Sequence, residues 1–106
     1  MNPAARDLLF LKWASRQMGV KVPVILWSDS RAKHPDLWTD GRTITVTREW
    51  ARQSQYERWK RLVHELLHIQ GLQHGVIDGR LYSTRPQYDE FSQHVLSELL
   101  QRMPVR

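Results

Sequence analysis

The residues most suited to chemistry lie in the segment His64-Glu65-Leu66-Leu67-His68. Positions four apart lie on one face of an α-helix, one turn from each other. At about 100° per residue, His64 and His68 point within roughly 40° of one another, and two imidazoles placed in this way can bind one zinc ion at about 2.0–2.1 Å. Glu65 points to one side of the pair, where it can take a proton from a metal-activated water. The segment therefore predicts a hydrolytic zinc site.

The helix that carries these residues is predicted from its own start and stop signals. Ser54 and Glu57 fit a capping box, and Gly71 is placed to end the helix after Gln70. Its apolar side chains centre on nearly the opposite side from the histidines, which gives the helix a core face and a histidine face. We expect the histidine face to look outward. The residues of the core face are Tyr56, Trp59, Val63, Leu66 and Gln70.

This segment resembles the zincin metallopeptidases, whose signature is H-E-x-x-H on a helix. It also matches the longer H-E-x-x-H-x-x-G-x-x-H pattern of the metzincin branch through Gly71 and His74. The resemblance implies that His64, His68 and His74 bind zinc and that Glu65 is the general base. In metzincins the glycine lets the chain turn so that the third histidine returns to the metal. The methionine turn of metzincins is not matched, because Met103 is the only methionine downstream of His74.

Small single-domain zincins, the minigluzincins and SprT-like peptidases, are similar in size and in the order of their elements. In minigluzincins the third ligand is a glutamate on a later helix. Glu90 is the candidate here, with Asp89 beside it and His94 one turn on. The choice between His74 and Glu90 stays open, and His74 is favoured because both Gly71 and His74 fall at the required offsets.

The resemblance also implies where a substrate would lie. Zincins hold an extended peptide along an edge strand above the metal helix, and Arg42 to Thr47 is the best candidate for that strand. Tyr82 or Tyr88 is a candidate donor to the oxyanion that forms at a peptide carbonyl. Trp38, next to the predicted hairpin turn, is a candidate for lining a cleft.

The rest of the chain predicts an α+β fold with a small three-stranded sheet, packed with an N-terminal helix, the metal-binding helix and a C-terminal helix. Asp40-Gly41 lies between β-prone runs and predicts a hairpin. Asn2-Pro3 is a helix start, and Gly19 and Pro104 mark helix ends. The expected elements are a helix over Pro3–Met18, a strand over 22–28, the hairpin over Leu37–Thr47, a helical turn over 48–53 and a helix over Pro86–Arg102.

Composition limits the remaining possibilities. The chain has 106 residues, which is one domain's worth, and we expect residues 1–106 to form a single domain. It has no cysteine, which excludes disulfides and thiolate ligands. The apolar run Leu8–Leu11 is too short for an export signal or a membrane span, so we expect a cytoplasmic protein without a membrane partner. The net charge of +5 leaves a nucleic-acid partner open.

Three hypotheses follow, and the first is a zinc metallopeptidase that acts on peptide or protein substrates. The second is a metal-dependent RNA hydrolase, because the spacing of His64, His68 and His74 is similar to that of the YbeY-type enzymes. Those enzymes have glycine after the first histidine, where this chain has Glu65, so peptide hydrolysis is favoured. The third is a non-catalytic, zinc-stabilised nucleic-acid-binding module, which the absence of cysteine disfavours. The oligomeric state is not predicted.

Overall fold

The computed structural model describes residues 4–28, 37–71, 75–77, 80–82 and 85–104, with side chains for residues 4–28, 39–71 and 90–104. None of the helices in these ranges is long and apolar enough to cross a membrane. The elements are, in chain order, α1 (Ala5–Gln17), β1 (Val24–Ser28), β2 (Leu37–Thr39), β3 (Thr43–Thr47), α2 (Arg48–Ala51), α3 (Gln55–Ile69), β4 (Gly75–Ile77), β5 (Arg80–Tyr82) and α4 (Arg85–Arg102).

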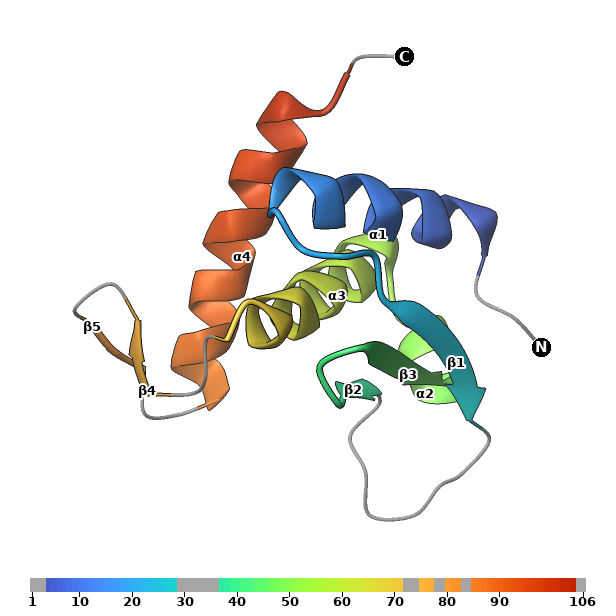
Figure 1. Cartoon of the computed structure of the whole chain (residues 1–106), viewed down its shortest axis with the longest axis horizontal. Coiled ribbons are helices and arrows are strands. Elements are labelled where there is room, and N and C mark those ends of the chain that lie inside the picture. The colour runs from blue at the N-terminus through green and yellow to red at the C-terminus, as the bar shows by residue number, and fades with distance from the viewer. Residues whose placement is uncertain (1–3, 29–36, 72–74, 78–79, 83–84, 105–106) are drawn as a thin grey trace.

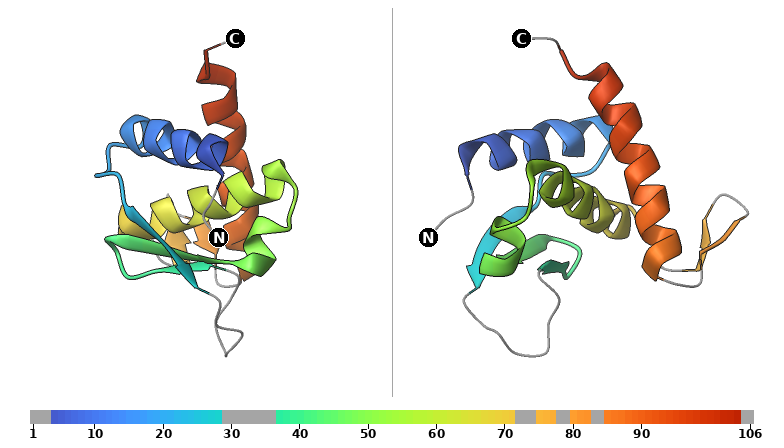
Figure 2. Two further views of the ribbon diagram at one scale, coloured as in Figure 1. Left: turned by 90° about the vertical axis from the view of Figure 1, so that its right-hand side faces the viewer. Right: turned by 180° about the vertical axis from the view of Figure 1, so that it is seen from behind.

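Helix α3 lies in the middle of the molecule (Figures 1 and 2). Helix α1 crosses it on one side, α4 packs along it, and the sheet of β1, β2 and β3 lies on the side away from α1. The hairpin of β4 and β5 stands apart from this sheet and contacts α4. Because it is packed from several directions, α3 is buried around most of its circumference between Leu62 and Leu67.

The first sheet has the strand order β1-β3-β2. Strands β2 and β3 are antiparallel, with Thr39 opposite Ile44, as the hairpin signal predicted. Gly41 adopts a φ of 96° in the turn between them, a conformation that favours glycine. Strand β1 pairs with the other edge of β3 in parallel, with Ile25 opposite Ile44. The chain reverses its direction twice between β1 and β3, and this is why the two strands run the same way.

The predicted fold, one small three-stranded sheet with three helices, is wrong. The chain mixes helices and strands, but β1 and β3 form a parallel pair, which the sequence patterns did not indicate. A second sheet of two strands, β4 and β5, is also present in the described part of the chain, and the helical turn expected over 48–53 forms a fourth helix, α2. Asp78-Gly79 stands between β4 and β5 in the sequence. This dipeptide is the same hairpin signal as Asp40-Gly41, but no hairpin was predicted from it.

The helices end close to their predicted positions. Helix α1 begins two residues after the expected Pro3 and ends at Gln17, just before Gly19, whose φ is 71°. The expected cap at Asn2-Pro3 lies outside the described residues. Helix α4 begins at Arg85, one residue before the expected Pro86, and ends at Arg102 as expected.

The core lies between α3 and the elements that surround it. Alternate residues of β3 point into it, so Ile44 and Val46 are fully buried. On β1 the partly buried Ile25 and Trp27 pack against it. Phe10 of α1 stacks on Trp59 of α3 with ring centroids 4.1 Å apart. The other buried apolar residues are Leu11, Ala14, Trp50, Leu62, Val63, Leu66, Leu67, Leu96 and Leu99.

Candidate metal centre

Local signals fix the two ends of α3 and thereby the positions of its histidines. Oγ of Ser54 accepts a hydrogen bond from the backbone N–H of Glu57 at 3.2 Å, so the serine half of the predicted capping box forms. At the other end, Gly71 follows the last turn with a φ of 97° and donates its N–H to the carbonyl oxygen of His68. Nε2 of Gln70 donates to the carbonyl oxygen of Met18 at 2.7 Å, which ties this end to α1.

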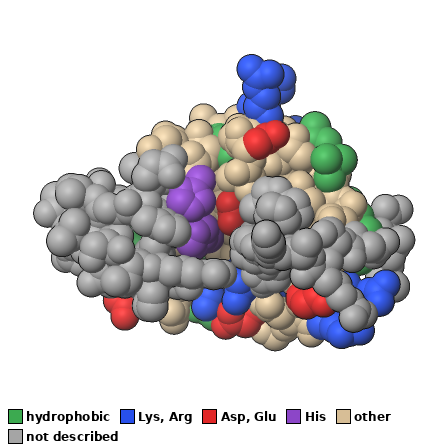
Figure 3. All heavy atoms as spheres, turned by 90° about the horizontal axis from the view of Figure 1, so that it is seen from below, with side chains coloured by type: hydrophobic (Ala, Val, Ile, Leu, Met, Phe, Trp, Pro, Cys, Tyr) green, Lys and Arg blue, Asp and Glu red, His purple; other side chains and the backbone are tan. Residues whose placement is uncertain are grey.

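The two histidines of the motif face each other. Nε2 of His68 lies 3.1 Å from Nε2 of His64, and the rings meet edge to face with centroids 4.8 Å apart. His64 is 9% exposed and His68 is half-buried. On the face seen in Figure 3, histidine side chains lie together at the surface with an acidic side chain beside them. The helix geometry therefore brings both imidazoles to one point, as their spacing predicted.

Glu65 lies next to this pair and is 7% exposed. This differs from the expected histidine face that looks freely outward. The reason is the central position of α3, which is packed by α1, α4 and the sheet. The core face is shorter than expected, because Tyr56 and Gln70 near the two ends of α3 are exposed while Trp59, Val63 and Leu66 are buried.

The third ligand is not placed by the structure. His74 lies outside the described residues, as do the side chains of Asp89, Tyr82 and Tyr88. Glu90 is exposed near the start of α4. Across the ranges that the structure describes, no three histidine, aspartate or glutamate side chains form a group that could hold a metal ion, so Glu90 does not join the histidine pair.

The strand expected to hold a substrate is a different one. Arg42 to Thr47 was predicted to be an edge strand, but β3 has a partner on each side, so its backbone is not available. The outer strands of this sheet are β1 and β2, and β2 lies against α3. The side chain of Trp38 on β2 lies outside the described part.

A buried carboxylate on α1 holds the first turns of α3 in place. Asp7 is 3% exposed and accepts hydrogen bonds from Nε of Arg58 at 2.9 Å and from Nε1 of Trp59 at 2.8 Å. Nη2 of Arg58 also donates to Asp7, at 3.3 Å. The negative charge lies in the first turn of α1, where the helix dipole stabilises it. This role of Asp7 was not predicted from the sequence. The signal that could have indicated it is a carboxylate directly before the apolar run Leu8–Leu11.

Comparisons with protein-family models, with curated proteins and with solved structures found no significant match to this chain.

Proposed function

We propose that this protein is a zinc-dependent peptidase in which His64, His68 and His74 bind the metal and Glu65 is the general base. The observation that carries the proposal is the pair of facing Nε2 atoms 3.1 Å apart, with a buried carboxylate next to them.

The residues fit a zinc ion. With bonds of about 2.0–2.1 Å, two nitrogens of a tetrahedral zinc site stand about 3.3–3.4 Å apart. The observed separation of 3.1 Å is close to this value, so both rings reach a common metal with little movement. Imidazole and carboxylate are the only strong ligand types that the cysteine-free chain offers, and zinc accepts both.

The chain's own residues account for the proton transfers of hydrolysis. A bound zinc ion supplies Lewis acidity, which lowers the pKa of water toward about 7 and polarises the peptide carbonyl. Glu65 takes one proton from the water while the water oxygen bonds to the carbonyl carbon. Glu65 then gives this proton to the amide nitrogen as the carbon–nitrogen bond breaks. Because Glu65 is nearly buried, bulk water competes little for its hydrogen bonds.

An extended peptide substrate fits the free edge of β2 better than β3. Strand β2 is an outer strand of its sheet, and it lies against the helix that carries the histidines. Backbone hydrogen bonds along such an edge bind a peptide with little dependence on its sequence. We place this activity in the cytoplasm, and cell fractionation with an antibody tests that location.

The test compares the wild-type protein with Glu65→Gln and with the exposed control Glu98→Gln. Zinc per chain is measured by mass spectrometry, and hydrolysis is followed on a mixed peptide library. We expect all three proteins to bind zinc equally and Glu65→Gln to lose at least about a hundredfold in rate. Full hydrolysis by zinc-loaded Glu65→Gln would refute the mechanism. Cleavage of RNA in place of peptides would favour the second hypothesis.

A further inference from the structure

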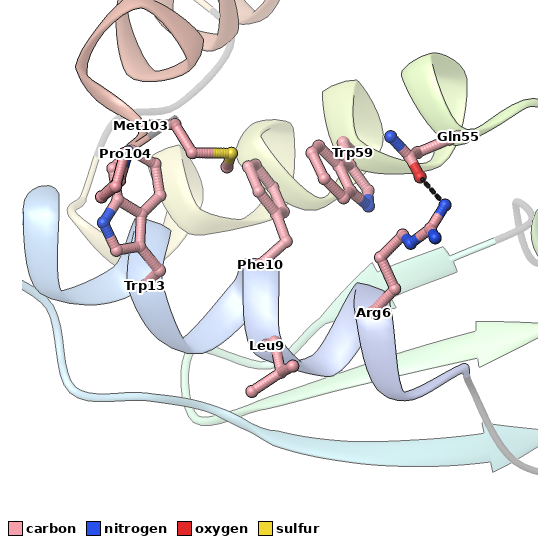
Figure 4. A pocket seen from close by; sticks show the side chains of 8 residues that line it. All are labelled: Arg6, Leu9, Phe10, Trp13, Gln55, Trp59, Met103 and Pro104. Atoms are coloured by element: carbon pink, nitrogen blue, oxygen red, sulfur yellow. Dashed lines mark hydrogen bonds between the residues drawn. The ribbon is translucent and has the colours of Figure 1, made fainter. Parts of the chain in front are cut away.

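A cavity lies away from the histidine pair, where α1, the start of α3 and the residues after α4 meet. It has a volume of about 490 Å³, which is within the usual range of about 300–1,000 Å³ for ligand sites. None of the residues that line it belongs to the candidate metal centre. Figure 4 shows Arg6 and Gln55 at one end, Trp13, Met103 and Pro104 at the other, and Phe10 and Trp59 between them.

The middle of the cavity is rigid and apolar. Phe10 and Trp59 stack with an interplanar angle of 6°, and Nε1 of Trp59 is held by the buried Asp7. Leu9, which is 57% exposed, and the partly exposed Met103 also line it. The exposed Leu9 offers apolar surface at the margin of the cavity, which a partner can bury at about 25 cal/mol per Å². This part of the cavity therefore fits an aromatic or long aliphatic side chain.

The charge of the cavity is at one end only. Nη1 of Arg6 donates to Oε1 of Gln55 at 3.1 Å, and in the described part of the chain Arg6 has no carboxylate partner. Arg58, by contrast, is paired with Asp7. Among the described residues that line the cavity, none is acidic. A guanidinium with unused donors binds a carboxylate through two parallel hydrogen bonds.

The distance between the Arg6 end and the Trp13 end of the cavity sets the spacing between the carboxylate and the apolar side chain of a ligand. Arg6, Leu9, Phe10 and Trp13 form one stripe along α1, and the first and last are seven residues apart. At about 1.5 Å per residue, this stripe is about 10 Å long. An extended peptide covers that length in about three residues.

We propose that this cavity binds an acidic, apolar peptide segment of a partner protein, with a large apolar side chain against Phe10 and Trp13 and a carboxylate on Arg6. The site is separate from the proposed peptidase centre, and neither proposal depends on the other. Charge complementarity selects this partner, because the described residues of the lining combine apolar walls with the cation of Arg6 and no anion.

The test uses three acetylated, amidated tetrapeptides: Phe-Ala-Ala-Glu, Phe-Ala-Ala-Lys and Ala-Ala-Ala-Glu. Binding to the ¹⁵N-labelled protein is followed by NMR, using the indole N–H signal of Trp13. The signal of Trp50, which is buried elsewhere in the core, serves as an internal control. We expect the first peptide to bind at least about tenfold more tightly than either of the others, since each lacks one of the two contacts.

Variants separate this site from general attraction to a protein of positive charge. Arg6→Glu should lose the Phe-Ala-Ala-Glu peptide and gain Phe-Ala-Ala-Lys, whereas Lys12→Glu, on the same helix outside the cavity, should change neither. Leu9→Ala should weaken binding, whereas Leu8→Ala, at a residue that is 41% exposed, should not. Equal binding of all three peptides, or an equal effect of Arg6→Glu and Lys12→Glu, would overturn the proposal. Zinc content should be the same in all four variants.

Discussion

Nε2 of His68 faces Nε2 of His64 across 3.1 Å, and the planes of the two rings are inclined at 68°. Two unprotonated imidazole nitrogens repel each other at this distance, so a proton or a metal ion has to lie between them. In the metal-free protein one ring donates a hydrogen bond to the other. We propose that zinc replaces this proton, because both rings already point to the same place.

The first prediction is that zinc stabilises the wild-type protein through this pair. Binding to the folded state at a hundredfold excess over Kd contributes about 2.7 kcal/mol, which raises Tm by roughly 10 °C or more in a domain of this size. His68→Ala should abolish the rise in Tm. His94→Ala, which removes an exposed histidine of α4, should leave it intact. An equal rise in all three proteins, measured by calorimetry with and without zinc, would show that the metal binds elsewhere.

The second prediction concerns the third ligand. Glu90 is exposed and does not group with the histidine pair, whereas His74 follows Gly71 at the offset of the metzincin pattern. Losing a group that only hydrogen-bonds a metal ligand usually weakens metal binding by about tenfold to a hundredfold. His74→Ala removes a proposed ligand and should therefore weaken zinc binding by more than this. Glu90→Ala should leave zinc affinity unchanged. Competition with a chromophoric chelator measures both affinities, and the reverse result would assign the ligand to Glu90.

The parts of the fold that were predicted correctly depend on local signals. Ser54 caps α3 and Gly71 ends it because both effects act within one helical turn. The spacing of His64 and His68 is set by the same local geometry, so the pair could be read before any tertiary structure was known.

The parts that were missed depend on contacts between distant residues. The apolar run that follows Pro23 indicates a strand at β1, but nothing in it says that Ile25 pairs with Ile44 or that β3 becomes central. Asp7 and Arg58 are 51 positions apart, and only packing of α1 on α3 brings them together. The burial of Glu65 has the same origin, because it depends on how many elements surround α3.

The third prediction is that Asp7 is a major source of stability. Asp7→Ala leaves the guanidinium of Arg58 and the indole N–H of Trp59 without their acceptor in a buried place. Removing one partner of a buried ion pair typically costs about 3–5 kcal/mol. Glu98→Ala is the control, since it removes a carboxylate whose contacts with Arg102 and His94 are exposed and should cost less than about 1 kcal/mol. Urea denaturation measures both, and equal losses would contradict the prediction.

The fourth prediction tests the turn that ends α3. The φ of Gly71 is 97°, and a Cβ added there would meet no atom of the described residues within 4 Å. The cost of Gly71→Ala is therefore a backbone cost alone, about 1–2 kcal/mol. Gly71→Asn should cost less, because asparagine tolerates this conformation better than alanine. Thermal unfolding compares the two variants, and equal stability of Gly71→Ala and the wild type would show that this turn is not fixed in solution.

The fifth prediction is a pH dependence at the β2–β3 turn. Oδ1 of Asp40 accepts hydrogen bonds from the backbone N–H groups of Arg42 and Thr43, both at 2.9 Å. These bonds, that from Arg42 first, hold the pKa of Asp40 below its ordinary value of 3.8. Since the folded protein binds this proton less readily than the unfolded chain, the ionised carboxylate stabilises the fold at every pH well above 3.8. That contribution is lost as the pH falls below this value and through the folded-state pKa.

Asp40→Asn isolates this effect, because asparagine keeps an oxygen at the same place and removes only the charge. The wild type should be more stable than the variant near neutral pH, where Asp40 is ionised. The difference should shrink as the pH falls below 3.8 and vanish once Asp40 is protonated in both states. Urea denaturation of both proteins across this range measures the difference. A difference that stays constant with pH would mean that the two backbone hydrogen bonds at Asp40 do not depend on its charge.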